Sequence, residues 1–244
     1  MLNILKIFEI LRSERIEQFP SPVDRKAYAD AVASCFMPCA QRILAGCFQV
    51  HIPIGGDAIK REIYPTAIEL YYHEEGEGRF KDPIMYHTDD RKLSEHKEWF
   101  VNRGITELPY FPLGNLNPHT SGIDVTFENP RERYRASFLI REYKVVYDSG
   151  KKRMVKNSTD IYEDMLPGGI PWCGDDWITW CDGGVLDETD IVRRWRRNVP
   201  DYRQTTDGSG RWEKNPDGEP SFAATGMRYA KCPFDWQFAR KEGE

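Results

Sequence analysis

The sequence predicts an α+β protein: a curved, mostly antiparallel β-sheet with a β-hairpin and surrounding helices. Three patterns lead to this prediction. Apolar residues recur at helical spacing in the chain before Gly46, whereas from Cys47 onward several short segments alternate between apolar and polar residues. Turn sequences such as DSGKK join neighbouring strand segments, which is typical of hairpins.

Two helices are expected at the start of the chain. Residues 1–20 read as an amphipathic helix that Pro20 ends. Glu9 interrupts the apolar run, no small-residue cleavage site follows, and no stretch of the chain reaches transmembrane length, so we expect a cytoplasmic protein. The second helix is expected to begin between Ser21 and Asp24 and to end at Gly46, with Pro38 kinking or splitting it.

Period-two alternation and apolar runs predict the strands of the sheet. These are expected over residues 47–54, 63–72, 122–127, 135–147 and 153–156, with a closing strand and a return segment between 225 and 240. The nearly continuous apolar stretch from Ala136 to Ile140 suits a central strand that is covered on both faces. In the strand of residues 63–72, alternation places Glu69 and Tyr71 on one face and Leu70 on the other.

The remaining segments are expected to be connections and short helices. Residues 73–112 form a long connection with a short helix over 93–104, and long connections inside a domain tend to be functional. Further helices are expected over 158–166 and 187–198, with Ser158 or Thr159 and Asp187 as plausible N-caps. Turn sequences dominate residues 200–220, and the chain contains no internal repeat.

Charge and cysteine content restrict the classes of function. A net charge of −5 is unfavourable for a strongly non-specific DNA binder, although a local basic patch can still bind DNA. The six cysteines form no CxxC pair, which favours free thiols in a reducing compartment. Since no histidine follows His119, we expect no zinc site.

Two strand residues and one basic cluster are the candidates for chemistry. Glu69 is either exposed on an edge strand or buried with a partner, because glutamate is depleted in strands. Arg141 either extends to solvent at its strand end or pairs with a carboxylate; if both strands lie in one sheet, the two side chains face one pocket. The basic cluster is either a solvated helix face or a phosphate-contact patch, and it consists of Arg193, Arg194, Arg196 and Arg197.

Six segments follow one another in a recognisable order: CAQRILAGCFQVHI, TAIELYYHEE, DPIMYH, SGIDVTF, RASFLIREYKV and GMRYAKCPFDWQFAR. In this order they resemble six parts of the alkyladenine (3-methyladenine) DNA glycosylase family. Those parts are the N-terminal stretch, the strand with the catalytic glutamate, the histidine loop, the hairpin strand, the arginine strand and the terminus. The resemblance implies a helical extension over residues 1–20 and one glycosylase-like domain over 21–244, with an insertion between 142 and 225.

The resemblance implies that the chain is a monofunctional N-glycosylase, a hydrolase of base excision repair. Such an enzyme removes damaged purines such as 3-methyladenine and needs no metal or organic cofactor. Glu69 would be the general base that activates a water, and Arg141 would help to hold and polarise that water. Residues that would contact the flipped base are Tyr71, His87 and Leu139. Residues that would contact DNA are Ser121 and Gly122 in the hairpin, and Arg193, Arg196 and Arg197.

A departure from the family pattern keeps other functions open. The family inserts a bulky aromatic residue from the hairpin tip into the DNA, and the matching residue here is Ser121, which cannot fill the vacated stack. One alternative is a non-catalytic protein that binds a nucleobase or nucleic acid on the same scaffold. Another is an N-glycosidase that acts on a free nucleoside. The partner is therefore damaged double-stranded DNA or a nucleoside-like small molecule, and the oligomeric state stays open.

Overall fold

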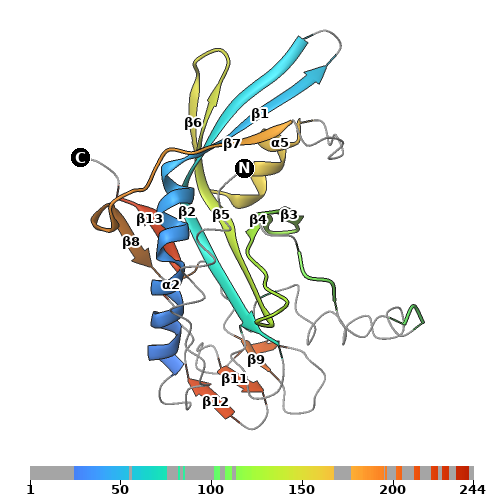
Figure 1. The fold of residues 1–244 in the computed structure, drawn as a ribbon, viewed down its shortest axis with the longest axis vertical. Helices are drawn as coiled ribbons and strands as arrows, with labels where there is room; N and C mark the ends of the chain where they lie inside the picture. Colours follow the sequence, from blue (N-terminus) through green and yellow to red (C-terminus); the bar gives the residue numbers. More distant parts are fainter. Residues whose placement is uncertain are drawn as a thin grey trace.

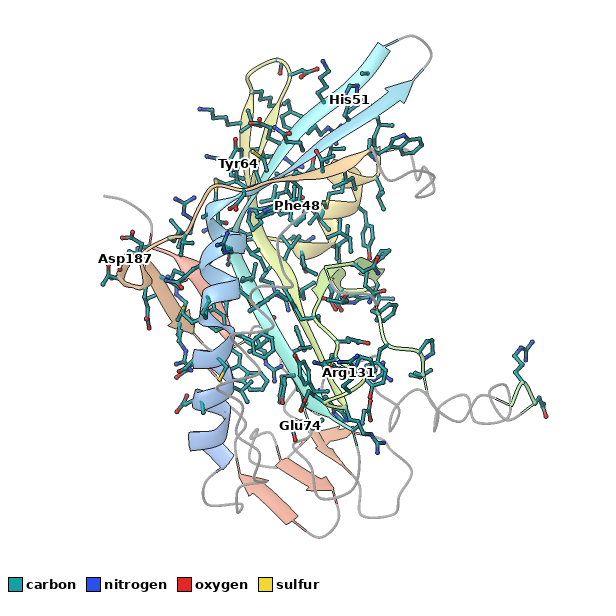
Figure 2. The ribbon with its side chains drawn as sticks, in the orientation of Figure 1. Phe48, His51, Tyr64, Glu74, Arg131 and Asp187 are labelled. Carbon is teal, nitrogen blue, oxygen red and sulfur yellow. The ribbon has the colours of Figure 1, made fainter. Side chains whose placement is uncertain are left out.

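Two long antiparallel strands, β2 (Asp57–Glu74) and β5 (Tyr134–Tyr147), run through the centre of the computed structural model (Figure 1). Their cross-strand pairs extend from Arg61–Tyr147 to Glu74–Tyr134. His51, on the strand beside β2, and Glu74 lie near opposite ends of this sheet in Figure 2. Both strands were expected from the sequence, although β2 begins six residues before the predicted start at Ile63.

The structure describes part of the chain. The described residues are 25–54, 57–75, 82, 85, 102–104, 108–111, 114–167, 177–194, 196, 202–204, 212–214, 221–224, 227–230 and 235–241. The predicted helix over residues 1–20, most of the predicted helix over 93–104, and the candidate residues His87 and Arg197 lie outside them.

Shorter strands extend each half of the central pair. β1 (Cys47–Ile54) pairs with the first half of β2, and β7 (Ile178–Cys181) pairs with β1. β13 (Gln237–Arg240) pairs with the second half of β2, and β8 (Ile191–Arg194) pairs with β13. Against β5 lie β4 (Gly122–Thr126), which is paired with β3 (Leu116–His119), and β6 (Lys152–Val155).

An irregular register bends β2 in its middle. The pairing of β2 with β5 shifts between Pro65 and Ala67 and again between Ala67 and Ile68. Proline has no N–H to donate to a sheet, and such irregularities increase local twist. In the described part of the chain, the nine strands of this sheet curl into an antiparallel half-barrel with few helices, which confirms the predicted α+β class and the curved antiparallel sheet.

Helix α2 (Arg25–Ala45) packs along one face of this sheet (Figure 1). Its buried Phe36 ring lies 5.8 Å from the ring centroid of Tyr72, 6.3 Å from that of Phe127 and 6.1 Å from that of Phe138. Such tilted aromatic contacts add to the free energy gained by burying the rings. The predicted helix is confirmed, and it continues across Pro38 without being split.

One predicted helix is wrong. Residues 187–198 were expected to be helical, but in the described part of this range, 187–194 and 196, a 3₁₀ turn, η4 (Glu188–Asp190), is followed directly by strand β8. Asp187 does cap the turn as expected, because its Oδ1 accepts the Thr189 N–H at 2.8 Å. Pairing of β8 with β13 satisfies the backbone of Ile191 and Val192, whose branched side chains favour a strand.

The other short elements follow the central sheet in the chain. The expected helical segment after β6 is a 3₁₀ turn, η2 (Ser158–Asp160), continued by α5 (Ile161–Met165), and Asn157 rather than Ser158 or Thr159 is its N-cap. A second small sheet has the order β10 (Trp212–Lys214), β9 (Tyr202–Gln204), β11 (Ser221–Ala224), β12 (Met227–Ala230). Among the described helices, none is both long and apolar enough to cross a membrane.

Candidate functional site

A row of side chains crosses four strands on the face of the sheet opposite to α2. The cross-strand pairs Gln237–Glu69, Glu69–Leu139 and Asp124–Leu139 align β13, β2, β5 and β4. Residues directly opposite each other in a sheet project to the same side. Glu69 and Asp124 therefore share one face with Leu139 between them, about 10 Å apart from Cα to Cα if two strand spacings separate them. Tyr71, two residues after Glu69, projects to the same side, and we call this group the polar face: Gln237, Glu69, Tyr71, Leu139 and Asp124.

Glu69 is fully buried, and its carboxylate accepts hydrogen bonds from the side chains of Arg141, Tyr71 and Gln237. Arg141 Nη2 donates to Oε2 at 2.5 Å, the Tyr71 hydroxyl donates to Oε2 at 3.1 Å, and Gln237 Nε2 donates to Oε1 at 3.2 Å. A buried carboxylate is costly unless it is paired and hydrogen-bonded in this way. The condition stated from the sequence is met, because the strands of Glu69 and Arg141 pair in one sheet and the two side chains are in contact.

Arg141 connects Glu69 to the short helical segment after β6. Its Nη1 donates to Ser158 Oγ at 3.1 Å, and the arginine side chain is 9% exposed. Burial lowers the pKa of Arg141, but the hydrogen bond and the charge of Glu69 outweigh this and raise it, so the guanidinium stays charged. The pair is thus a fixed carboxylate–guanidinium unit that contains one charge of each sign.

A second carboxylate on the polar face was missed by the sequence reasoning. Asp124 Oδ2 accepts the Ser137 hydroxyl at 3.1 Å, and Oδ1 lies 3.1 Å from Nε2 of His119. Asp124 also acts on Tyr71: burial is the largest of the effects that raise the pKa of that hydroxyl, followed by Glu69, with a smaller contribution from Asp124. Alternation in GIDVTF and RASFLIR would have placed Asp124 and Ser137 beside Glu69.

Gly122, a predicted DNA-contact residue, begins β4 where the hairpin touches Ser158. Its φ is +138°, and a Cβ built there would lie 3.0 Å from Leu139 Cδ1 and 3.0 Å from the Ser158 carbonyl oxygen. The Tyr162 hydroxyl donates to the carbonyl oxygens of Gly122 and His119, at 2.7 Å to Gly122. The neighbouring candidate Ser121 is exposed in the turn between β3 and β4.

The substitution Gly122→Ala is expected to lower the free energy of unfolding by about 1–3 kcal/mol, because it adds a clash to an unfavourable φ. Gly150→Ala is the matched control: its φ is +76°, but nothing lies within 4 Å of the added Cβ, so only backbone strain results. Denaturant unfolding of both variants measures the difference. Equal losses would show that the hairpin is free to move away from Ser158.

Arg193 and Arg196 do not lie on the expected helix face, and Arg197 lies outside the described residues. Arg193 lies on strand β8, where Nη2 pairs with Asp30 at 3.1 Å and Nε donates to the Asp235 carbonyl at 3.1 Å. Arg196 is 6% exposed. Helical spacing was wrong here because strand pairing and a buried ion pair determine where these side chains lie.

Arg196 instead fastens the long connection after β2 to the sheet. Its Nη1 and Nη2 donate to the two carboxylate oxygens of Asp82 at 2.6 and 3.2 Å, and Nη1 also donates to the Leu70 carbonyl at 3.2 Å. The guanidinium carbon lies 4.9 Å from the ring centroid of Tyr71 and 5.0 Å from that of Trp236. Arg196 therefore packs against the ring of Tyr71 and helps to fix this side chain of the polar face in position.

A buried ion cluster lies at the far end of the central strand pair. Arg135 Nε donates to Glu75 at 2.6 Å, Nη1 donates to Glu128 at 3.1 Å, and Nη2 donates to the Leu108 carbonyl at 2.8 Å. Glu128 also accepts the Phe111 N–H at 2.6 Å. The cluster fastens the segment 108–111, which ends the long connection, to the sheet.

Stability is expected to fall as the pH rises from about 4.5 to about 7. Burial raises the pKa of Glu128 to about 7, despite Arg135 and the Phe111 N–H, which lower it. A carboxyl whose pKa is higher in the folded state stabilises that state below the unfolded pKa and loses this contribution as pH rises through the folded pKa. The loss is up to about 3 kcal/mol, at 1.36 kcal/mol per pKa unit. Thermal unfolding across this range measures it, and Glu128→Gln should flatten the profile; an equally steep profile in Glu128→Gln would assign the pH dependence to other groups.

Comparisons of the chain with protein-family models, with curated proteins and with solved structures found no match. The glycosylase resemblance therefore stays a prediction. In the part of the chain that the structure describes, no three His, Cys, Asp or Glu side chains are grouped to hold a metal ion.

Proposed function

We infer that the chain is an N-glycosylase that hydrolyses the bond between a purine and its sugar by attack of water. The observation that supports this is the geometry of Glu69: a buried carboxylate held in the sheet by Arg141, Tyr71 and Gln237. A carboxylate that is ionised and fixed in position is suited to take a proton from water, and a neighbouring guanidinium suits the polarisation of that water.

The proposed step is a single displacement at the anomeric carbon. A water oxygen forms the bond to this carbon while one of its protons passes to Glu69. The bond from carbon to nitrogen breaks, and its electron pair leaves with the base. An N-alkylated purine is already cationic at the ring, so it leaves as a neutral molecule and needs no additional proton. The negative charge of Glu69 also stabilises the positive charge that develops on the sugar.

Access to Glu69 needs an opening motion. Its side chain has no exposed surface in this structure, and Leu139 beside it is 1% exposed. Side chains or backbone that cover the polar face must therefore move before the sugar of a substrate can approach the Glu69 carboxylate. In many enzymes, loops that close over the reacting groups must likewise open before the substrate can enter.

A free nucleoside is the second candidate substrate, and one observation favours it over duplex DNA. Two of the three arginines assigned to phosphate contacts already form ion pairs with carboxylates of this chain: Arg196 with Asp82 in a buried pair, and Arg193 with Asp30 in a partly exposed one. Ser121 at the hairpin turn cannot replace an extruded base. A nucleoside needs neither phosphate contacts nor an intercalating residue.

Base release from a panel of substrates tests the proposal. The panel contains duplex DNA with an N-alkylated purine, duplex DNA with a deaminated purine, the same strands unpaired, and the free nucleosides. The free base is separated and quantified by chromatography. Release from any substrate that requires Glu69 supports the enzyme. Binding of a nucleobase without release from any of them would favour the non-catalytic alternative.

A further inference from the structure

Two cysteines face each other across the edge of the main sheet. In the pairing of β1 with β7, Cys47 lies directly opposite Cys181. Directly opposite residues in antiparallel strands have Cα atoms about 4.5 or 5.5 Å apart. Both separations fall within the range of about 4.4–6.8 Å that disulfides span. The backbone therefore needs little or no movement to join the two sulfurs.

The two thiols differ in exposure and lie in contact range. Cys47 is 4% exposed, whereas Cys181 is exposed, and both are reduced in this structure. Their side chains are close enough to hydrogen-bond, and Tyr64 on β2 contacts Cys47 from the other side. Burial is the main cause that raises the pKa of the Cys47 thiol to about 11, with Cys181 as a further cause. An attack from solvent therefore begins at Cys181.

Close backbone contacts hold β7 in this register. A Cβ on Gly46 would lie 2.6 Å from the Cys181 carbonyl oxygen, and one on Gly183 would lie 2.0 Å from the Ala45 carbonyl oxygen. Only glycine fits at such approaches. Beyond the strand, Gln41 Nε2 donates to the Leu186 carbonyl at 2.9 Å. Contacts at Cys181 and beyond it in the chain, together with the pairing of β7 with β1, thus keep it opposite Cys47.

We propose that Cys47 and Cys181 are a redox-active dithiol, which a low-molecular-weight disulfide such as oxidised glutathione converts to a cross-strand disulfide. The Cys181 thiolate attacks one sulfur of the small disulfide, forms a mixed disulfide and releases one small thiolate. Cys47 then loses its proton and attacks the Cys181 sulfur, which expels the second small thiolate. Two protein thiols are oxidised, one small disulfide is reduced to two thiols, and the two protons end on the released thiolates. The proposal does not depend on the proposed function.

The test exposes the native chain to mixtures of oxidised and reduced glutathione, followed by acid quenching, alkylation and digestion without reductant. The number of thiols that can be alkylated after denaturation should fall by two. Mass spectrometry should find the peptide of Cys47 joined to that of Cys181, and excess reduced glutathione should reverse this.

Variants separate the two steps. Cys47→Ser should accumulate a mixed disulfide with glutathione at Cys181, because the second thiol is missing. Cys181→Ser, a change at an exposed position, should form no Cys47 disulfide. Cys35 is a half-buried residue of α2, and Cys35→Ser is the control. This variant should form the Cys47–Cys181 disulfide as the unmodified chain does. A stable glutathione adduct at Cys181 in the unmodified chain, or a disulfide from Cys181 to another cysteine such as Cys173, would overturn the proposal.

Discussion

Replacing Glu69 by glutamine is expected to lower the rate of base release by about 10²- to 10⁴-fold, the range that a general base contributes. Glutamine has nearly the same shape, and its amide oxygen can still accept hydrogen bonds from Arg141 and Tyr71. It cannot take a proton from water. Chemistry is therefore lost while the shape of the side chain is kept, although the buried Arg141 guanidinium loses its counter-charge. Single-turnover release of the free base measures the chemical step apart from substrate binding.

The matched control is Glu62→Gln on the same strand. Each of the two glutamates accepts a hydrogen bond from the tyrosine two residues later in the strand. The Tyr64 hydroxyl donates to Glu62 at 2.6 Å, and the Tyr71 hydroxyl donates to Glu69 at 3.1 Å. Glu62 lies outside the polar face and is half-buried, so the same chemical change should leave base release unchanged. Equal rates in the unmodified chain and Glu69→Gln would remove Glu69 from the mechanism. Equal losses in both variants would indicate a general effect of removing a carboxylate from β2.

The face that carries Glu69 could be predicted from the sequence because it follows from local alternation. Burial of Ile68 and Leu70 against α2 forces Glu69 and Tyr71 to the opposite side. The meeting with Arg141 needed only the further condition that both strands share a sheet. Asp124 could have been found in the same way, since it lies two residues into a strand whose start at Gly122 was predicted.

The placement of Arg193 and Arg196 could not be predicted, since it depends on partners far away in the chain. The segment DIVRRWRRN alternates poorly and has charged residues at helical spacing. Its strand exists because β13 supplies a pairing edge, and Arg196 is buried because Asp82 and two aromatic rings surround it. Such long-range contacts override local propensity. The same holds for Gln237, which reaches Glu69 from a strand 168 residues away in the sequence.

Replacing Arg135 by methionine is expected to lower the free energy of unfolding by about 3–5 kcal/mol at neutral pH, as is typical when one partner of a buried ion pair is removed. The arginine side chain is 1% exposed, and those of Glu75 and Glu128 are 2% and 0% exposed. Methionine fills much of the volume but leaves two carboxylates in the cluster without their shared cation. The segment 108–111 also loses its hydrogen bonds from Arg135 to the Leu108 and Pro109 carbonyls.

Two comparisons show whether Arg135→Met loses stability through buried charge or through lost packing. One is a variant of a partly exposed ion pair, and the other is Arg135→Met at a lower pH. Arg193→Met removes an ion pair in which both side chains are partly exposed, 27% and 41%, so it should cost only about 0–1 kcal/mol. The loss in Arg135→Met should shrink at pH 5.5, where Glu128 is protonated because burial raises its pKa to about 7. Adding Glu128→Gln to Arg135→Met should recover part of the loss at pH 8. The loss of stability in Arg135→Met could instead be the same at both pH values and in the double variant. That result would show that Arg135 stabilises the fold through its packing and its hydrogen bonds to the carbonyls of 108–111, and that neutralising the charge of Glu128 contributes nothing.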